Sequence, residues 1–145
     1  TMTAFRESFR YFNTFGGNPV SCAAAMAVLN VMEEEGLMEQ ARDVGDYARA
    51  GLKELAQRHE AIGDVRGSGL FFGAEMVLDR NTKEPAIDFT NRVANEMRQR
   101  GVLLNKLGIH YNTLKIRPNL QFTRENADLL LSTLDTVLST VPLHP

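Results

Sequence analysis

The fold is decided by one central stretch, Ile62-Gly63-Asp64-Val65-Arg66-Gly67-Ser68-Gly69-Leu70-Phe71-Phe72-Gly73-Ala74-Glu75-Met76-Val77-Leu78. Residues 62–66 predict a short strand, and Gly67-Ser68-Gly69 interrupts it. From residue 70 onward, apolar side chains occupy every second position, which is typical of a strand with one buried face. Some residues between them are apolar as well, so we expect the other face to be partly covered. The stretch therefore predicts two strands at the centre of the chain.

Helical patterns flank these strands on both sides. From Leu37 to His59, apolar residues recur at steps of three and four and form one continuous stripe. After the strands, Phe89 begins a second series that repeats every four residues and that Gly101 ends. Thr123 is suited to cap a last helix. We expect that helix to turn the following residues toward the core: Ala127, Leu130, Leu131, Leu134, Val137, Leu138 and Val141.

Two further short strands are predicted at 102–105 and 113–117, and Asp79–Pro85 reads as a polar surface loop. The resulting order is helix, helix, strand, strand, helix, strand, strand, helix. This mixture favours an α+β fold, a mostly antiparallel sheet of about three to four strands with helices on one face.

The N-terminal part of the chain does not fit that layer. Asn18-Pro19 signals the start of an Ala-rich helix over 20–32, which Gly36 ends. Its small-residue surface has no obvious local partner. The preceding segment, Phe5–Phe15, holds five aromatic residues without a clear period. Exposed aromatic surface of this kind usually contacts another domain or subunit. We therefore expect residues 1–35 to be an interface segment and residues 36–145 to form the α+β domain.

Composition limits the class of protein. A chain of 145 residues can bury the hydrophobic core of one domain. A formal net charge of −2 argues against nucleic-acid binding, which needs clustered Lys and Arg. No apolar run reaches the ~18–20 residues of a membrane span, and Thr1–Arg10 lacks the apolar centre of a signal peptide. We expect a soluble, cytoplasmic chain that binds neither nucleic acid nor membrane.

Cysteine and histidine suggest no reactive site. The single cysteine, Cys22, excludes an internal disulfide and fits a reducing compartment. Because it lies beside three alanines, we expect a buried and inert thiol. The histidines His59, His110 and His144 are far apart in sequence, so no metal site is expected. No pair of acids stands out as a general acid and base.

Two segments can carry chemistry. In Thr14-Phe15-Gly16-Gly17-Asn18-Pro19, a glycine turn leads into a helix start, where backbone amides and a threonine hydroxyl can meet a phosphate. The alternative is an ordinary turn with a helix cap. Arg117 follows a strand and precedes Pro118, a place where a guanidinium can grip a carboxylate or phosphate with two hydrogen bonds. It shares a strand face with Lys115. The alternative is a surface ion pair with an acid.

Four segments, in this order along the chain, resemble the C-terminal part of class III aminotransferases, which are fold-type I enzymes dependent on pyridoxal phosphate. They are Tyr11-Phe12-Asn13-Thr14-Phe15-Gly16-Gly17-Asn18-Pro19-Val20-Ser21-Cys22-Ala23-Ala24-Ala25, Gly63-Asp64-Val65-Arg66-Gly67-Ser68-Gly69-Leu70-Phe71-Phe72-Gly73, Leu114-Lys115-Ile116-Arg117-Pro118 and Asn126-Ala127-Asp128-Leu129-Leu130. Together they cover nearly the whole chain. The resemblance implies the small C-terminal domain of such an enzyme.

The resemblance also implies roles for two residues. Thr14 matches the threonine that binds the cofactor phosphate across a homodimer interface, in the partner subunit's site. Arg117 matches the arginine that holds the substrate carboxylate in many members. We therefore expect pyridoxal phosphate as cofactor and small amino and keto compounds as substrates.

One part of the family's machinery is missing from the sequence. These enzymes link pyridoxal to a lysine and hold its ring nitrogen with an acid. The family's lysine lies farther upstream of the threonine than the thirteen residues that precede Thr14. The first lysine of the chain is Lys53, and none of the lysines matches the catalytic position. We therefore expect the large domain to be absent and this chain to be inactive alone.

Within class III, some segments resemble one branch, notably Pro19-Val20-Ser21-Cys22, Thr82-Lys83-Glu84-Pro85-Ala86 and Gly101-Val102-Leu103-Leu104. That branch is similar to alanine–glyoxylate aminotransferases and to phospho-lyases of phosphorylated amino alcohols. In a transaminase Arg117 would bind a carboxylate; in a lyase it would bind a phosphate. We expect the parent enzyme to be the aminotransferase, which transfers an amino group between an amino acid and a keto acid. The alternatives are the phospho-lyase and a non-catalytic packing or dimerisation module, because the other substrate contacts would come from residues outside this chain.

Overall fold

The two central strands form an antiparallel hairpin, β1 (Ile62–Ser68) and β2 (Phe71–Asp79). The computed structural model describes residues 2–144. The hairpin turns at Gly69-Leu70, and Gly69 takes the left-handed backbone conformation, with φ of 50°. Gly67 and Ser68 belong to β1, so the predicted break is shorter than expected. Phe72, Ala74 and Met76 of β2 are buried, as the alternation predicts.

Two more strands complete the sheet in the order β1-β2-β5-β4, with every neighbouring pair antiparallel. They are β4 (Asn105–Leu107) and β5 (Thr113–Ile116). The predicted polar loop also contains a two-residue strand, β3 (Glu84–Pro85), which pairs with β2. The α+β prediction with a mostly antiparallel sheet is confirmed.

The strand predicted at 102–105 is wrong by three residues, because β4 begins only at Asn105. The backbone amide of Val102 donates to the carbonyl of Met97, at 2.9 Å, and that of Gly101 donates to Arg98, at 3.1 Å. These amides close the end of the preceding helix and are not free for a strand ladder. Leu103 is consequently 84% exposed.

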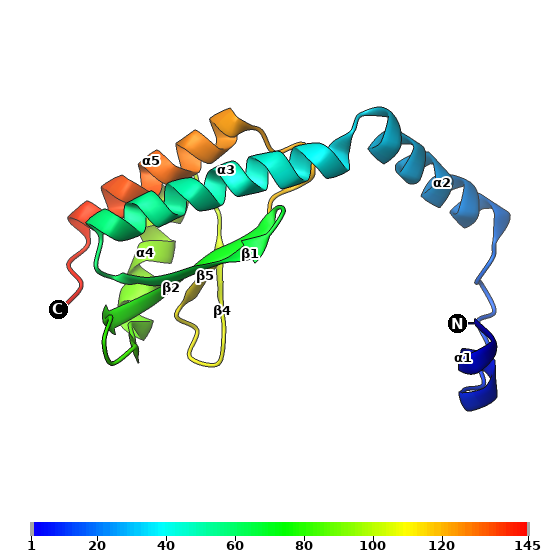
Figure 1. The fold of residues 1–145 in the computed structure, drawn as a ribbon, viewed down its shortest axis with the longest axis horizontal. Helices are drawn as coiled ribbons and strands as arrows, with labels where there is room; N and C mark the ends of the chain where they lie inside the picture. Colours follow the sequence, from blue (N-terminus) through cyan, green and yellow to red (C-terminus); the bar gives the residue numbers. More distant parts are fainter. Residues whose placement is uncertain (1, 145) are drawn as a thin grey trace. The chain divides into compact units, whose positions relative to one another are not determined.

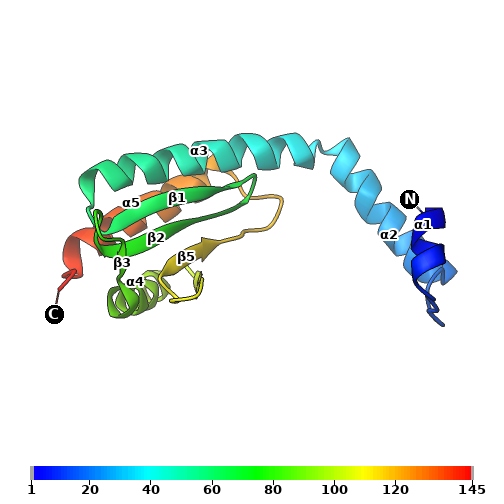
Figure 2. The ribbon, with the colours of Figure 1, turned by 60° about the horizontal axis from the view of Figure 1, so that its bottom comes forward.

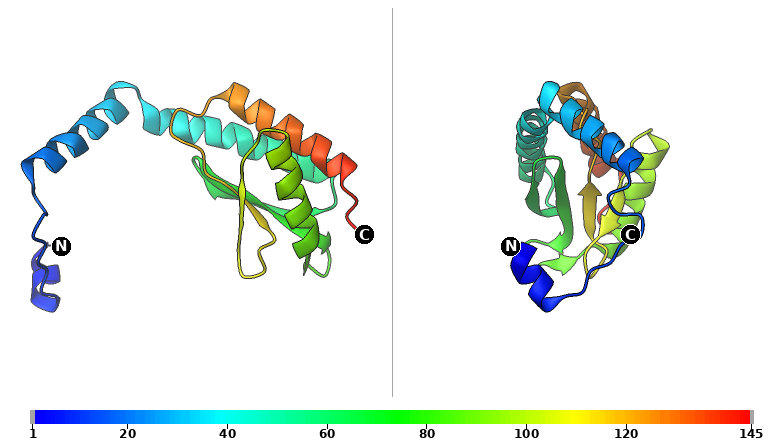
Figure 3. Two further views of the ribbon diagram at one scale, coloured as in Figure 1. Left: turned by 180° about the vertical axis from the view of Figure 1, so that it is seen from behind. Right: turned by 90° about the vertical axis from the view of Figure 1, so that its right-hand side faces the viewer.

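Three helices pack on one face of the sheet (Figures 1 and 2). They are α3 (Leu37–Arg58), α4 (Ile87–Gln99) and α5 (Arg124–Thr140). The views in Figure 3 show α3 and α5 lying alongside each other, with α4 over the β5–β4 side. Their apolar stripes meet the buried faces of β2 and β5 in one core. Its fully buried members include Leu52, Met76, Phe89, Val93, Met97, Leu114 and Leu134.

The sequence signals at the helix ends are confirmed. Thr123 accepts a hydrogen bond from the amide of Asn126, whose side chain accepts from the Thr123 amide in return. This capping box satisfies two amides that the helix leaves unpaired. Of the seven core positions predicted for α5, Leu131 and Val141 are half-buried and the other five are buried.

Residues Thr1–Glu35 form a separate unit from Gly36–Pro145. Two helices make up this first unit, α1 (Met2–Ser8) and α2 (Pro19–Glu34), of which α1 was not predicted because its apolar residues follow no period. Phe5 stacks on Phe9 with ring centroids 5.5 Å apart. Cys22 is exposed, so the expectation of a buried thiol is wrong: α2 has no buried residue.

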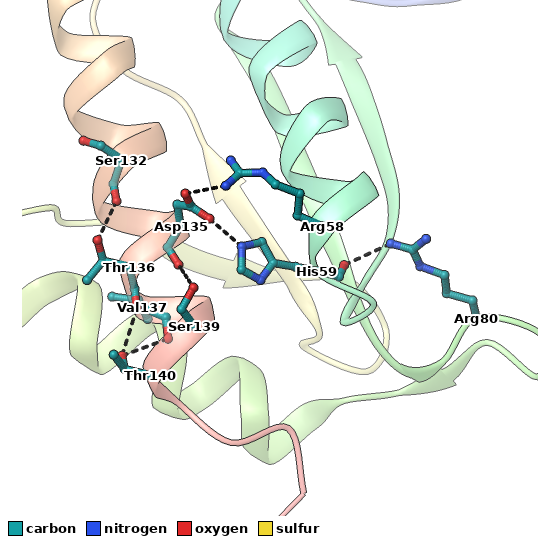
Figure 4. A network of polar contacts seen from close by, with 9 residues as sticks. All are labelled: Arg58, His59, Arg80, Ser132, Asp135, Thr136, Val137, Ser139 and Thr140. Carbon is teal, nitrogen blue, oxygen red and sulfur yellow. Dashed lines mark hydrogen bonds and ion pairs between the residues drawn. The ribbon is translucent and has the colours of Figure 1, made fainter.

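An ion-pair network joins the end of α3 to α5 (Figure 4). Asp135 accepts from Arg58 Nη1 at 2.8 Å and from His59 Nε2 at 2.5 Å. The hydrogen bond from His59, together with Arg58, holds the pKa of the Asp135 carboxyl below its usual range. Arg80 reaches the same end of α3, where its guanidinium donates to the carbonyls of Glu60 and His59. The cation at the negative end of the helix stabilises the position of α3.

We expect Asp135→Asn to lower the free energy of unfolding of the chain by about 1 kcal/mol at pH 7. Because the folded-state pKa of Asp135 is lowered, its contribution is present above the ordinary aspartate pKa and is lost as the pH falls through the folded pKa. Urea unfolding should therefore separate variant and parent at pH 7 and bring them together near pH 2. Asp43→Asn, which removes an exposed pair with Arg42, is the control and should change little at either pH. A pH-independent difference for Asp135→Asn would contradict the assigned ionic role.

Candidate functional site

The sheet face opposite α3, α4 and α5 carries a row of four aligned residues. The strand register pairs Arg66 with Gly73, Gly73 with Lys115, and Lys115 with Asn105. Because side chains alternate along a strand, these positions face away from the buried Ala74 and Leu114. The row therefore runs across β1, β2, β5 and β4 on the face that the helices of this unit leave open.

The acids Asp64 and Glu75 of this open face share one cation, Arg66. Arg66 Nη1 lies 2.7 Å from Asp64 Oδ2 and 2.5 Å from Glu75 Oε2. The hydrogen bond to Glu75, followed by that to Asp64, raises the pKa of the Arg66 guanidinium above its ordinary value. The three charges form one cluster on β1 and β2 with a formal net charge of −1, and within the described residues neither carboxylate forms an ion pair with Lys115 or Arg117.

Arg117 directly follows β5, as the position before Pro118 predicts, and its side chain is exposed. It lines a hollow of about 410 Å³ together with Leu103, Leu104, Asn105 and Lys115. Among residues 2–144, no ion pair or side-chain hydrogen bond involves the Arg117 guanidinium. The alternative of a surface ion pair with an acid therefore has no support in the described structure. An unpaired guanidinium beside a hollow can bind a carboxylate or phosphate.

Lys115 was not selected from the sequence as a site residue, although alternation placed it on the same strand face as Arg117. The structure brings both side chains to the same hollow, where Lys115 is half-buried. Within the described part of the chain, the Lys115 ammonium has no acidic partner. The period-two pattern of β5 is the signal by which it could have been found.

Thr14 lies in the turn that precedes α2, in the first unit. Asn13 Oδ1 accepts from the amides of Phe15 and Gly16 at 3.2 and 3.0 Å, and Asn18 caps the first free amides of α2. The amides expected to meet a phosphate are thus largely occupied by these two side chains. The Thr14 hydroxyl is exposed and makes no hydrogen bond within the described residues. A free hydroxyl donor fits a phosphate oxygen, so Thr14 fits a cofactor phosphate by its chemistry.

Solved structures that resemble this fold include enzymes of the pyridoxal-phosphate fold-type I class. A phospholyase from Arthrobacter, in complex with phosphoethanolamine, superposes with a TM-score of 0.88 at 45% identity, covering 97% of this chain and 33% of that one. An amine transaminase from an uncultivated Pseudomonas species, in its PLP-bound form, gives a TM-score of 0.83 at 34% identity, covering 95% of this chain and 31% of that one.

The family model "Aminotransferase class-III" matches residues 2–138. The chain therefore belongs to the class III aminotransferase family, whose cofactor is pyridoxal phosphate. It is 48% identical over 129 residues to the mitochondrial alanine–glyoxylate aminotransferase 2 homolog 2 of Arabidopsis thaliana, covering 89% of the chain and 27% of that protein. It is 44% identical to the ethanolamine-phosphate phospho-lyase homolog 1 of Caenorhabditis elegans, covering 89% of the chain and 28% of that protein.

The relatives span both activities of the branch that the sequence resembles, so the expected family and branch are confirmed. The chain spans roughly a quarter to a third of the length of these relatives. In the part of the chain that the structure describes, no helix is long and apolar enough to cross a membrane. One relative carries "mitochondrial" in its name, and the cytoplasmic location of this protein stays a prediction.

Proposed function

We propose that this chain is the C-terminal part of a pyridoxal-phosphate enzyme that transfers an amino group between an amino acid and a keto acid. The observation that carries the proposal is the guanidinium of Arg117 at the end of β5, beside the open sheet face, which has no ion-pair partner among residues 2–144. A bidentate guanidinium fixes both the position and the orientation of a substrate anion. Arg117 would thereby hold the carboxylate so that the amino group of the substrate reaches the cofactor.

Thr14 would hold the cofactor phosphate through its free hydroxyl, in the site of the partner subunit of a homodimer. Pyridoxal phosphate, when bound, supplies the electron sink for bond breaking next to the amino group. The first unit, with exposed Phe12 and Phe15 close to Thr14, would contact the large domain and the partner subunit. This assigns residues 1–35 to the interface and residues 36–145 to the small domain.

The chain alone would be inactive, because none of its four lysines is held in a closed site. Lys53 is exposed on α3, and Lys83 Nζ donates to the Gly63 carbonyl at 3.3 Å. Lys106 donates to Asn91, and Lys115 lies on the open sheet face. A lysine that forms a Schiff base needs a desolvated or charge-tuned site that lowers its pKa. The cofactor-linked lysine would belong to the large domain.

The second candidate function is a phospho-lyase of phosphorylated amino alcohols. The observation that favours it is the match to the Arthrobacter phospholyase at 45% identity with a TM-score of 0.88. In that case Arg117 would bind the phosphate of the substrate, and the net reaction would consume water and yield inorganic phosphate, ammonia and the carbonyl compound left from the amino alcohol.

One experiment tests both candidates, with the full-length protein and the 145-residue chain assayed side by side. We expect the full-length protein to transfer amino groups from an amino acid to a keto acid, measured as keto-acid consumption. Release of phosphate and ammonia from phosphoethanolamine without transfer would instead establish the second candidate. The chain alone should show neither activity and no covalent cofactor–lysine linkage by mass spectrometry after borohydride reduction. A stoichiometric linkage to one of its lysines would overturn the assignment of that lysine to the large domain.

A further inference from the structure

We infer that Lys115 and Arg117 form one two-cation site for a phosphate monoester, which makes Lys115 the residue that selects a phosphorylated amine over an amino acid. The inference rests on the proposed role of Arg117 in holding the anion of the substrate. It adds the second cation and the chemical class of the ligand, and it favours the second candidate function.

The geometry places both cations at one hollow. Lys115 is in β5, opposite Gly73 on one side and Asn105 on the other, and Arg117 follows two residues later. Both line the hollow of about 410 Å³ that Leu103, Leu104 and Asn105 complete. Gly73 presents no side chain beside Lys115. Asn105 adds a neutral amide to the lining, whose N–H groups can donate to a bound anion.

The charge balance of this hollow is positive. Its lining includes no Asp or Glu, and neither does that of the other two hollows that Lys115 lines. The two acids of the open face, Asp64 and Glu75, are both paired with Arg66. Two adjacent cations without an acid repel each other, and an anion that binds between them relieves this repulsion.

Charge and the number of acceptor oxygens determine whether a carboxylate or a phosphate monoester fits the two-cation site better. A carboxylate carries one negative charge and is satisfied by the two-pronged guanidinium of one arginine. A phosphate monoester carries about −1.5 to −2 charges near pH 7 and has three acceptor oxygens. Two of its oxygens can accept hydrogen bonds from the Arg117 guanidinium, and the third can accept one from the Lys115 ammonium. The second cation therefore contributes far more to binding a phosphate than to binding a carboxylate.

The test uses the full-length protein with Lys115→Met, Lys115→Arg and the control Lys53→Met. Lys53 is an exposed lysine of α3, on the opposite side of the sheet, and its substitution makes the same change in charge. The measurements are kcat/KM for phosphoethanolamine, kcat/KM for alanine, and the inhibition constant of inorganic phosphate. We expect Lys115→Met to lower kcat/KM for phosphoethanolamine by about 30-fold and to weaken phosphate inhibition similarly. The value for alanine should change less than about threefold.

Lys115→Arg should recover most of the loss, and Lys53→Met should match the parent protein. Equal losses for both substrates, or phosphate inhibition unaffected by Lys115→Met, would overturn the inference. A parent protein that does not turn over phosphoethanolamine and is not inhibited by phosphate would overturn it too. The proposed role of Arg117 is tested separately. If Arg117→Ala lowers kcat/KM and Lys115→Met does not, the two-cation site is overturned and the proposed function stands. If neither variant lowers kcat/KM, the proposed function is overturned as well.

Discussion

Replacing Arg117 by alanine in the full-length protein should lower kcat/KM for its amine substrate by about 100-fold or more, while pyridoxal phosphate stays bound. The guanidinium is exposed beside a hollow and pairs with no acid within residues 2–144, so its removal breaks no described internal contact. The loss should therefore fall on substrate binding and orientation, with an unfolding midpoint close to that of the parent. Steady-state kinetics, cofactor absorbance and urea unfolding measure the three quantities.

Two companion variants sharpen the result. Arg117→Lys keeps the charge but loses the two-pronged geometry, so it should recover only part of the activity. Thr14→Ala should show the opposite pattern, a weakened retention of cofactor with a smaller effect on substrate KM. If Arg117→Ala reduced cofactor retention and substrate use equally, the assignment of Arg117 to the substrate would be wrong.

The largest stability loss should come from Gly45→Ala, at about 3 kcal/mol in the free energy of unfolding. A Cβ at Gly45 of α3 would lie 2.0 Å from the carbonyl oxygen of Gly69, in the hairpin turn. The same oxygen accepts a hydrogen bond from Arg49 Nη1 at 3.0 Å, so the turn is held against the helix. Because the new Cβ would clash with a backbone carbonyl and not with a side chain, no rotamer change can relieve the clash. The hairpin must therefore shift away from α3. Urea unfolding of the chain measures the loss.

Gly51→Ala is the matched control on the same helix. The nearest atoms to a Cβ there all belong to the Leu131 side chain, Cδ1 at 2.3 Å, Cδ2 at 3.1 Å and Cγ at 3.3 Å, and this side chain can change its rotamer. The higher helix propensity of alanine, about 1 kcal/mol, offsets the repacking. We expect a change within about 1 kcal/mol. Similar losses for the two variants would show that the approach of Gly69 to α3 is not what makes Gly45 necessary.

The helices α2 to α5 were predictable because their signals are local and repeated, whereas α1 has no such signal. The stripe from Leu37 to Leu55 spans the helix, and Asn18 and Thr123 mark two helix starts with side chains that cap them. The ends of strands were less predictable, because a strand forms only where a neighbouring strand supplies hydrogen-bond partners. Val102 is a residue type with high strand propensity, yet its amide donates to the Met97 carbonyl at the end of α4. The two residues of β3 form a strand only because β2 lies beside them.

The candidate site was predictable in part. Arg117 stood out because it ends a strand before a proline, and Thr14 because it precedes a glycine turn. Lys115 carried the same local signal, but its significance depends on having no acid nearby. That absence follows from Arg66 binding Asp64 and Glu75 across two strands, which no local pattern reveals. Burial of Cys22 was predicted wrongly for a related reason: an alanine-rich helix indicates close packing but does not say where its partner is.

By itself, the sequence determined the α+β class, the helices α3, α4 and α5 with their buried faces, and membership of a pyridoxal-phosphate family, because periodicity and short motifs are properties of neighbouring residues. Only the tertiary structure determined where the stretch from Ile62 to Leu78 turns and which residues of other strands lie beside it. It turns at Gly69 against Gly45, and its open face aligns Arg66, Gly73, Lys115 and Asn105 across four strands. The physical reason is that strand register and charge pairing act between residues far apart in the chain.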